Sequence, residues 1–448
     1  MVKRSKKINL DTIIFIIISI VMLFIPIVKI ISYICNYIGL TKDIFVVNQV
    51  YVLYLAIPFL LTTYIVKKKN ITWYDGFIYF LIITAIISTL FAVNKKVSIL
   101  GFYGRYEGLI TLISYYLIFL NVKEIKNRKY YKYLIYIFIF LGLFQTQNAF
   151  LQVFSDYKYI IRAEKPFMAM AFCGNPNFYG SYMVMLTLIT SVLYLINKKC
   201  FILYIIFFIG LILANSTGPF LGYILAIIFF IIIYKKHIKL SRVGILLFTS
   251  IICFLSVNYI LEIKQSKNEN FKLEENYTIK SDLLNINNKE EGSQKIDNGR
   301  IDIWKRSLPL VKKYFSVGAG IDNYYFVFKD YPLDKAHNIY LQILVTNGLP
   351  SLLLYLGLCL LVFIRNIKFK DPLTTALFVA FVGYSIQGFA NISVIDVAPY
   401  FYIIMGIIAS EICIEKNLDE QVLTWMHNFC IEKNLDEQVL RSIQIKAG

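Results

Sequence analysis

The stretch LDTIIFIIISIVMLFIPIVKII, residues 10–31, is almost entirely apolar. A bilayer core of about 30 Å needs roughly 20 apolar residues in one helix, whose backbone polar groups must be hydrogen-bonded within the segment. The stretch is long enough to cross a membrane as a single helix. A basic start before an apolar run is also found in secretory signals, but this run is too long and lacks a small-residue cleavage site. We therefore interpret it as a membrane span.

Apolar runs of this kind recur throughout the chain, which is 58% hydrophobic and 16% aromatic. Its mean hydropathy of +0.62 is too high for an ordinary soluble protein. We expect an all-α, polytopic integral membrane protein with about twelve transmembrane helices. The expected spans are residues 10–31, 45–66, 76–93, 109–121, 134–154, 168–196, 201–214, 220–234, 243–263, 339–364, 374–392 and 397–412. Only residues 215–219 separate the seventh and eighth, which form either a tight hairpin or one broken helix.

The predicted spans divide the chain into four parts. Residues 1–263 hold spans one to nine, 264–338 form a large extracytoplasmic loop with short amphipathic helices, 339–414 hold spans ten to twelve, and 415–448 form a cytoplasmic tail. Within the tail region, residues 413–423 recur unchanged as residues 430–440. We assign this duplication no activity.

Lys and Arg cluster in alternate connections between the spans. Because basic residues are retained on the cytoplasmic side in short loops, this pattern places both termini in the cytoplasm of a multi-pass protein of the cell membrane. The net charge of +18 is then mostly a consequence of topology. It does not indicate nucleic-acid binding, because no folded soluble domain remains to carry a phosphate-binding patch.

The second half of the large loop carries the candidate chemistry. Apolar residues at three- and four-residue spacing from Ile301 to Phe315 predict a helix along the outer membrane surface. Asp297 or Asn298 would cap it and Arg300 would lie in its first turn, where an Arg fork makes an anion site. Alternatively, Arg300 snorkels or pairs with a neighbouring Asp.

A group of aromatic residues follows this helix. Tyr324 and Tyr325 lie in a short segment after glycine-punctuated residues. Their rings are able to stack on sugars, and Tyr is equally typical of the aromatic belt at a membrane interface.

His337 is the one histidine of three that lies in the predicted outward loop. A neutral imidazole near the membrane surface is suited to act as a general base near neutral pH. A single His at a helix boundary more often serves as a helix-end hydrogen-bonding residue. The sequence around it favours the catalytic role.

That sequence resembles the O-antigen ligase and polymerase superfamily from about residue 101 to about residue 406. The motifs that carry the resemblance are Gly101-Phe-Tyr-Gly-Arg-Tyr-Glu-Gly108, Phe172-Cys-Gly-Asn-Pro-Asn177, Asn298-Gly-Arg-Ile-Asp-Ile-Trp304, Val317-Gly-Ala-Gly320, Lys335-Ala-His-Asn-Ile-Tyr-Leu-Gln342 and Thr346-Asn-Gly-Leu-Pro350. Each motif is short, and their order and topological placement give the resemblance its specificity.

The resemblance implies a metal-independent glycosyltransferase without a cofactor. Its donor would be a polyprenyl-diphosphate-linked glycan and its acceptor a hydroxyl on a glycan, lipid or protein, at the outer face of the membrane. By this resemblance His337 would deprotonate the acceptor, and Arg300 would bind the donor diphosphate. Tyr324, Tyr325 and Asn338 are expected glycan contacts.

One position departs from the family pattern. Ligase members often have an Arg in a Ser-Arg-Gly turn between two hairpin helices, where this chain has Ser216-Thr217-Gly218. Arg105 and Arg162 are our candidates to supply the missing cation, with Lys165 a weaker one. For Arg105 the alternative is a local ion pair with Glu107.

Two other classes of function are compatible with many spans. A transporter or flippase would place polar groups at the bilayer midplane, whereas the polar motifs here cluster at the predicted outer surface. A non-catalytic scaffold of a cell-envelope complex would leave Arg300 and His337 replaceable. We therefore expect a surface polysaccharide ligase or polymerase, with a transporter as the alternative.

Overall fold

The computed structural model describes residues 9–38, 48–68, 70–154, 168–266, 300–328 and 333–410. The regular structure within these ranges is helical, as predicted. The helices are α1 (Leu10–Tyr37), α2 (Gln49–Lys67), α3 (Trp73–Leu90), α4 (Lys95–Leu100), α5 (Leu109–Lys123), α6 (Lys129–Phe154), α7 (Pro176–Asn197), α8 (Phe201–Leu213), α9 (Thr217–Ile233), η1 (Lys235–His237), α10 (Leu240–Ser266), α12 (Arg300–Lys313), α13 (Tyr324–Val327), α14 (Ile339–Asn366), α15 (Pro372–Gln387), η4 (Gly388–Ala390) and α16 (Ala398–Ala409).

Each predicted span coincides with one of these helices, which confirms the all-α polytopic fold. Among the described residues, eight helices are long and apolar enough to cross a membrane, namely α1, α2, α3, α6, α7, α10, α14 and α15. Four shorter apolar helices, α5, α8, α9 and α16, occupy the remaining predicted positions. A count of twelve crossings stays a prediction, because these four are shorter than an apolar bilayer core requires.

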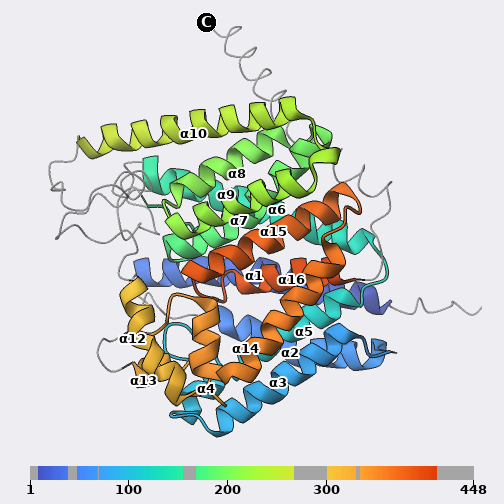
Figure 1. Cartoon of the computed structure of the whole chain (residues 1–448), viewed down its shortest axis with the longest axis vertical. Coiled ribbons are helices and arrows are strands. Elements are labelled where there is room, and N and C mark those ends of the chain that lie inside the picture. The colour runs from blue at the N-terminus through green and yellow to red at the C-terminus, as the bar shows by residue number, and fades with distance from the viewer. Residues whose placement is uncertain are drawn as a thin grey trace, which may run out of the picture.

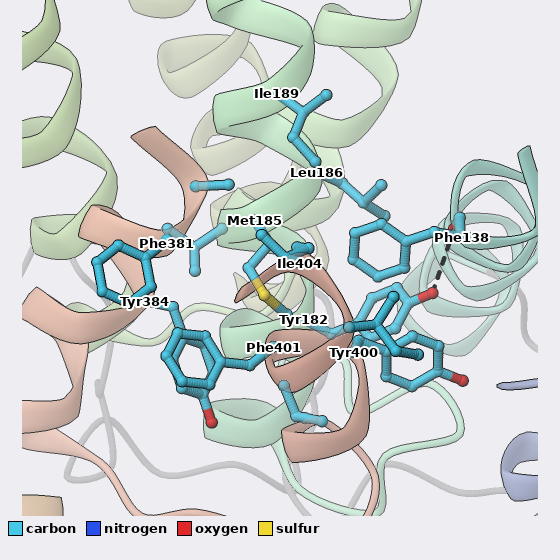
Figure 2. Packing of buried hydrophobic residues seen from close by; sticks show 14 of the residues in the cluster. Phe138, Tyr182, Met185, Leu186, Ile189, Phe381, Tyr384, Tyr400, Phe401 and Ile404 are labelled. Atoms are coloured by element: carbon cyan, nitrogen blue, oxygen red, sulfur yellow. Dashed lines mark hydrogen bonds between the residues drawn. The ribbon is translucent and has the colours of Figure 1, made fainter. Parts of the chain in front are cut away.

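The span helices form a bundle with α7 in its interior (Figure 1). In an 18-residue apolar stretch of α7, 94% of the residues are buried, against 22% in α10, which lies at the edge. Helix α7 packs against α8, α9 and α15, and α16 packs against α5. Figure 2 shows aromatic and aliphatic side chains from α6, α7, α15 and α16 filling the centre, where the Tyr182 hydroxyl donates to the Phe138 carbonyl at 3.2 Å.

Helices α8 and α9 form a hairpin. The ring of Phe208 in α8 lies 5.4 Å from that of Tyr223 in α9, so the two helices run side by side. The outer end of α9 lies at one end of the bundle, where Tyr234 donates to the Ile367 carbonyl at 2.7 Å. This settles the choice between a hairpin and one broken helix.

Ionic groups join the helices at that same end, which we call the basic end. Asp75, at the start of α3, is paired with Lys68 at 2.6 Å and with Lys123 at 3.2 Å. Lys68 and Lys123 also bind Glu124, at 2.7 and 2.8 Å. The network ties α2, α3 and α5 together where they leave the apolar layer.

The opposite end of the bundle, which we call the loop end, gathers residues 101–108, 168–175, 391–397 and the segment of α12, α13 and 333–338 (Figure 1). Helix α12 confirms the predicted amphipathic helix. Its packing face differs from the predicted stripe, because Ile301 and Leu308 are exposed while Ile303, Ser307 and Leu310 face a small core around Tyr324. The predicted caps Asp297 and Asn298, and the duplicated tail segment, lie outside the described residues.

Helices α9 and α15 approach closely through glycine, as small residues allow between membrane helices. A Cβ on Gly222 would lie 2.8 Å from the Gln387 Cβ and 3.0 Å from the Gly383 carbonyl oxygen. Gly244 in α10 has nothing within 4 Å of the same position. The two glycines therefore form a matched pair for a packing test.

We predict that Gly222→Val lowers the free energy of unfolding by about 1–3 kcal/mol, because the backbone of α15 must move away. Gly244→Val should change it by no more than a few tenths of a kcal/mol, the difference in helix propensity between the two residues. Thermal denaturation of the purified variants in one detergent measures both. Equal melting temperatures for the two variants would contradict the close contact between α9 and α15.

Candidate functional site

A cavity of about 410 Å³ opens at the loop end of the bundle. It lies between α1, residues 103–105, the chain entering α7, Asp334 and residues 394–396. Its charged lining residues are Lys29, Arg105, Asp334 and Asp396. The cavity is therefore polar on several sides, although it adjoins the apolar helix bundle.

His337 is held at the start of α14 by its neighbours on both sides. The Asn338 side chain caps α14, accepting from the backbone N–H groups of Tyr340 and Leu341 at 3.0 Å. The Ala336 N–H donates to Gln342 Oε1 at 2.8 Å, and the Ala336 carbonyl accepts from Trp304 Nε1 at 3.1 Å. His337 itself has φ 51°, a left-handed conformation that costs energy for a residue other than glycine. Its position is thus imposed by the hydrogen bonds around it.

The imidazole of His337 is kept neutral by its surroundings. Burial lowers its pKa to about 4, and the positive charge of Arg300 acts in the same direction. The carboxylate of Asp334 opposes these effects, while Arg105 and Lys335 lower the pKa further. At neutral pH the ring therefore has a free nitrogen lone pair and is able to accept a proton.

Arg105 is brought to the cavity by the loop at residues 101–108. Its guanidinium forms an ion pair with Asp334 and lies 5.3 Å from the centre of the Phe178 ring. Burial raises the pKa of Asp334, but the charge and hydrogen bond of Arg105, together with the charge of Lys335, hold that pKa below its usual range. The alternative of an Arg105–Glu107 pair is not what the structure shows, since Glu107 accepts from the Tyr115 hydroxyl at 2.6 Å.

A buried ion pair links the same loop to the segment before His337. Lys335 pairs with Asp322, and both side chains are buried. Asp322 also accepts from the backbone N–H groups of Phe102 and Glu107, at 2.6 and 3.2 Å. The 101–108 loop and residues 334–337 are therefore connected twice, by Asp322–Lys335 and by Arg105–Asp334.

Arg300 is the first residue of α12, and its charge reaches His337. Asp302, one of its possible partners from the sequence, pairs with Arg306 at 2.8 Å. Arg162, Lys165 and Asp297 lie outside the described residues. In the turn that lacks the family Arg, Ser216 is buried and hydrogen-bonds to Asn177.

The three expected glycan contacts occupy different environments. Tyr324 is 0% exposed and its hydroxyl bonds to Ser307 at 2.6 Å, so it belongs to the small core under α12. Asn338 is the cap of α14, and its side-chain oxygen already accepts two hydrogen bonds. Both placements argue against a role in sugar binding. Tyr325 is 40% exposed, with its ring 4.8 Å from that of Phe102, and remains accessible.

Sequence reasoning missed Lys29, a lysine within the apolar run of α1 that lines the cavity. The available signal was its position, because an ionisable residue inside a membrane span often marks a functional site. The ion pair of Arg105 with Asp334 and the hydrogen bond from Phe102 to Asp322 were also missed, since each joins residues more than 200 positions apart.

The fold and this charged cavity define a multi-pass membrane protein with a polar site at one end of its helices. Residues 202–356 match the family model described as O-antigen ligase, and this confirms the resemblance to the O-antigen ligase and polymerase superfamily. The matched part contains Arg300 and His337, whereas Arg105 precedes it. No curated protein matches the chain. The match supports a membrane glycosyltransferase of the ligase or polymerase type.

The electrostatics of His337 are testable by NMR, because the chain has only three histidines. With labelled histidine, we predict one resonance with a titration midpoint near pH 4, absent from His337→Gln. Arg300→Gln should raise that midpoint, since the Arg300 charge disfavours the imidazolium.

Arg306→Gln is the matched control, because Arg306 lies on the same helix, half exposed and paired with Asp302. It should leave the midpoint unchanged. A His337 midpoint near 6.5 in the wild-type protein would show that the ring is not shielded as the structure indicates.

Proposed function

We propose that this protein transfers a glycan from a polyprenyl-diphosphate donor to a hydroxyl acceptor at the outer face of the cytoplasmic membrane. The observation that carries the proposal is a neutral His337 whose pKa is influenced by the charges of Arg300, Arg105 and Asp334. His337 and Arg300 lie within the part of the chain that matches the O-antigen ligase family. A base and adjacent cations are the two components that this transfer requires.

In the proposed step His337 accepts the proton of the acceptor hydroxyl. The acceptor oxygen forms a bond to the anomeric carbon of the donor sugar, and the bond from that carbon to the diphosphate oxygen breaks. The electron pair stays on the diphosphate, which leaves on its polyprenyl chain. Arg300 and Arg105 stabilise the charge that develops there, as fixed donors do in a water-poor site without a metal.

The low pKa of His337 is compatible with this role. The donor-free site is cationic around the ring, and that charge contributes to the low value. A bound diphosphate offsets the charges of Arg300 and Arg105, so it raises the pKa of His337 toward the ordinary histidine range. The base therefore gains proton affinity when the donor is bound, and it stays unprotonated before then.

The proposed topology follows from the two ends of the bundle. Basic residues flank the helices at the basic end, which we assign to the cytoplasm together with both termini. The loop end, with residues 264–338 as its largest connection, then faces outward. Tyr325 remains our candidate for stacking on the glycan, and Arg162 a further candidate cation.

Two observations favour transfer over transport. The cavity and His337 lie at the end of the helices, and apart from Lys29 the buried charged residues of the described ranges lie at helix ends or in connections. A transporter would carry its binding groups near the bilayer midplane.

We predict that His337→Ala lowers the rate of glycan transfer by about a hundredfold, as for loss of a general base. Arg300→Gln should have a comparable effect through loss of charge stabilisation in the transition state. The assay uses membranes containing the lipid-linked donor, with a chelator present and the variants equally expressed.

Arg306→Gln serves as the control and should transfer at the wild-type rate. The proposal is wrong if His337→Ala and Arg300→Gln both transfer normally. It is also wrong if the wild-type protein moves the lipid-linked glycan across the membrane without forming a new glycosidic bond, which is the transporter outcome.

A further inference from the structure

Lys29 is a buried cation that forms no ion pair in the part of the chain that the structure describes. It lies in α1, is 7% exposed, and lines the 410 Å³ cavity together with Arg105. Among the described residues it makes no hydrogen bond and no ion pair, and its ammonium lies 5.7 Å from the centre of the Tyr33 ring. An ammonium removed from water without a counter-ion is costly.

The nearby carboxylates are engaged elsewhere. Asp334 is paired with Arg105, and Asp396 accepts from Gln49 Nε2 at 3.0 Å. Burial raises the pKa of Asp396 and the charge of Lys29 lowers it, so the two groups sense one another across the cavity without forming an ion pair. Of the two cations that line the cavity, Arg105 is in an ion pair and Lys29 is not.

The backbone beside Lys29 leaves its ammonium open to the cavity. Gly174 has φ 72°, and a Cβ there would lie 3.3 Å from Lys29 Nζ and 3.0 Å from the Tyr33 hydroxyl. A side chain at this position would crowd the ammonium. Glycine keeps the space between the chain entering α7 and α1 free for a ligand atom.

We propose that Lys29 binds the diphosphate of the lipid-linked donor, opposite Arg105, and supplies the cation that the turn at residues 216–218 lacks. This inference rests on the proposed function. The cavity volume falls within the range of small-molecule sites, roughly 300–1,000 Å³. Lysine binds phosphate as a point charge, and in the proposed step the leaving diphosphate takes the electron pair of the broken bond.

The test compares binding and stability in the same purified variants. Lys29→Gln and Lys29→Met should bind polyprenyl diphosphate about 10–100-fold more weakly than wild type, the loss expected for one charge-assisted hydrogen bond. Lys29→Arg should bind within a few-fold of wild type. Without ligand, Lys29→Met should melt at or above the wild-type temperature, because an uncompensated buried charge has been removed.

Lys95→Gln is the matched control, since Lys95 is an exposed lysine at the start of α4, at the same end of the bundle. It should bind polyprenyl diphosphate as wild type does. Inorganic diphosphate and polyprenol distinguish recognition of the diphosphate from recognition of the lipid. The Lys29 variants should lose affinity for inorganic diphosphate but retain any affinity for polyprenol.

Each failure has its own signature. Wild-type transfer that depends on His337, together with unchanged diphosphate binding by Lys29→Gln, would overturn the role of Lys29 and leave the proposed function standing. Neutral variants that unfold without ligand would also overturn it, because Lys29 would then be structural. Lys29-dependent diphosphate binding by a protein that transfers no glycan would support the site and refute the proposed function.

Discussion

Charge is confined almost entirely to the two ends of the helix bundle, and the rest of the structure depends on this constraint. An apolar layer supplies no partner for an ionised side chain, so such groups are placed where the helices end or where they are paired. At the basic end, Asp75 binds Lys68 and Lys123. At the loop end, the pairs are Arg105–Asp334 and Lys335–Asp322. The ionic groups of the site thus lie together at one of the two ends of the bundle where charged side chains are accommodated.

The two pairs at the loop end also determine the geometry around His337. Both connect the 101–108 loop to the residues just before His337, one through Asp334 and one through Lys335. The Asn338 cap then fixes the following turn of α14. Local backbone strain at His337 is tolerated because the flanking residues are held by hydrogen bonds and ion pairs. Asp334, Lys335 and Asn338 thus hold the backbone around His337, the residue that we propose as the base.

The positions of the span helices were predictable, whereas the pairings between segments were not. Apolar run length alone located the helices, including the short α8 and α9, because the bilayer limits what an apolar run is able to form. The spacing of residues 301–315 predicted α12 but not its packing face, since exposed Ile301 and Leu308 carry the same apolar signal as buried residues. The spacing of apolar residues does not distinguish a helix face that packs against the protein from one that contacts another apolar environment.

For the candidate site, too, single residues were predictable from the sequence but their spatial partners were not. The motifs singled out His337 and Arg300, whose roles stay predictions. Tyr324 packs in the small core under α12, and an aromatic residue in a loop has no sequence mark that separates packing from ligand stacking. The Arg105–Asp334 pair joins residues 229 positions apart, a relation that one sequence does not contain. Lys29 was visible as a charge within an apolar run, but its meaning depends on the cavity that α1 shares with the chain entering α7.

His337 and Lys29 are both buried near other cations, but His337 is neutral and Lys29 carries a charge. Burial and adjacent cations hold His337 neutral by disfavouring a further positive charge. Lys29 is buried beside the cavity and forms no ion pair with a described carboxylate. A dianionic ligand relieves both conditions at once, because it offsets the cations and makes protonation of the imidazole less costly. In the proposed reaction the negative charge of the diphosphate, held in place by the cations, also prepares the base, so that donor binding and activation of the acceptor are coupled electrostatically.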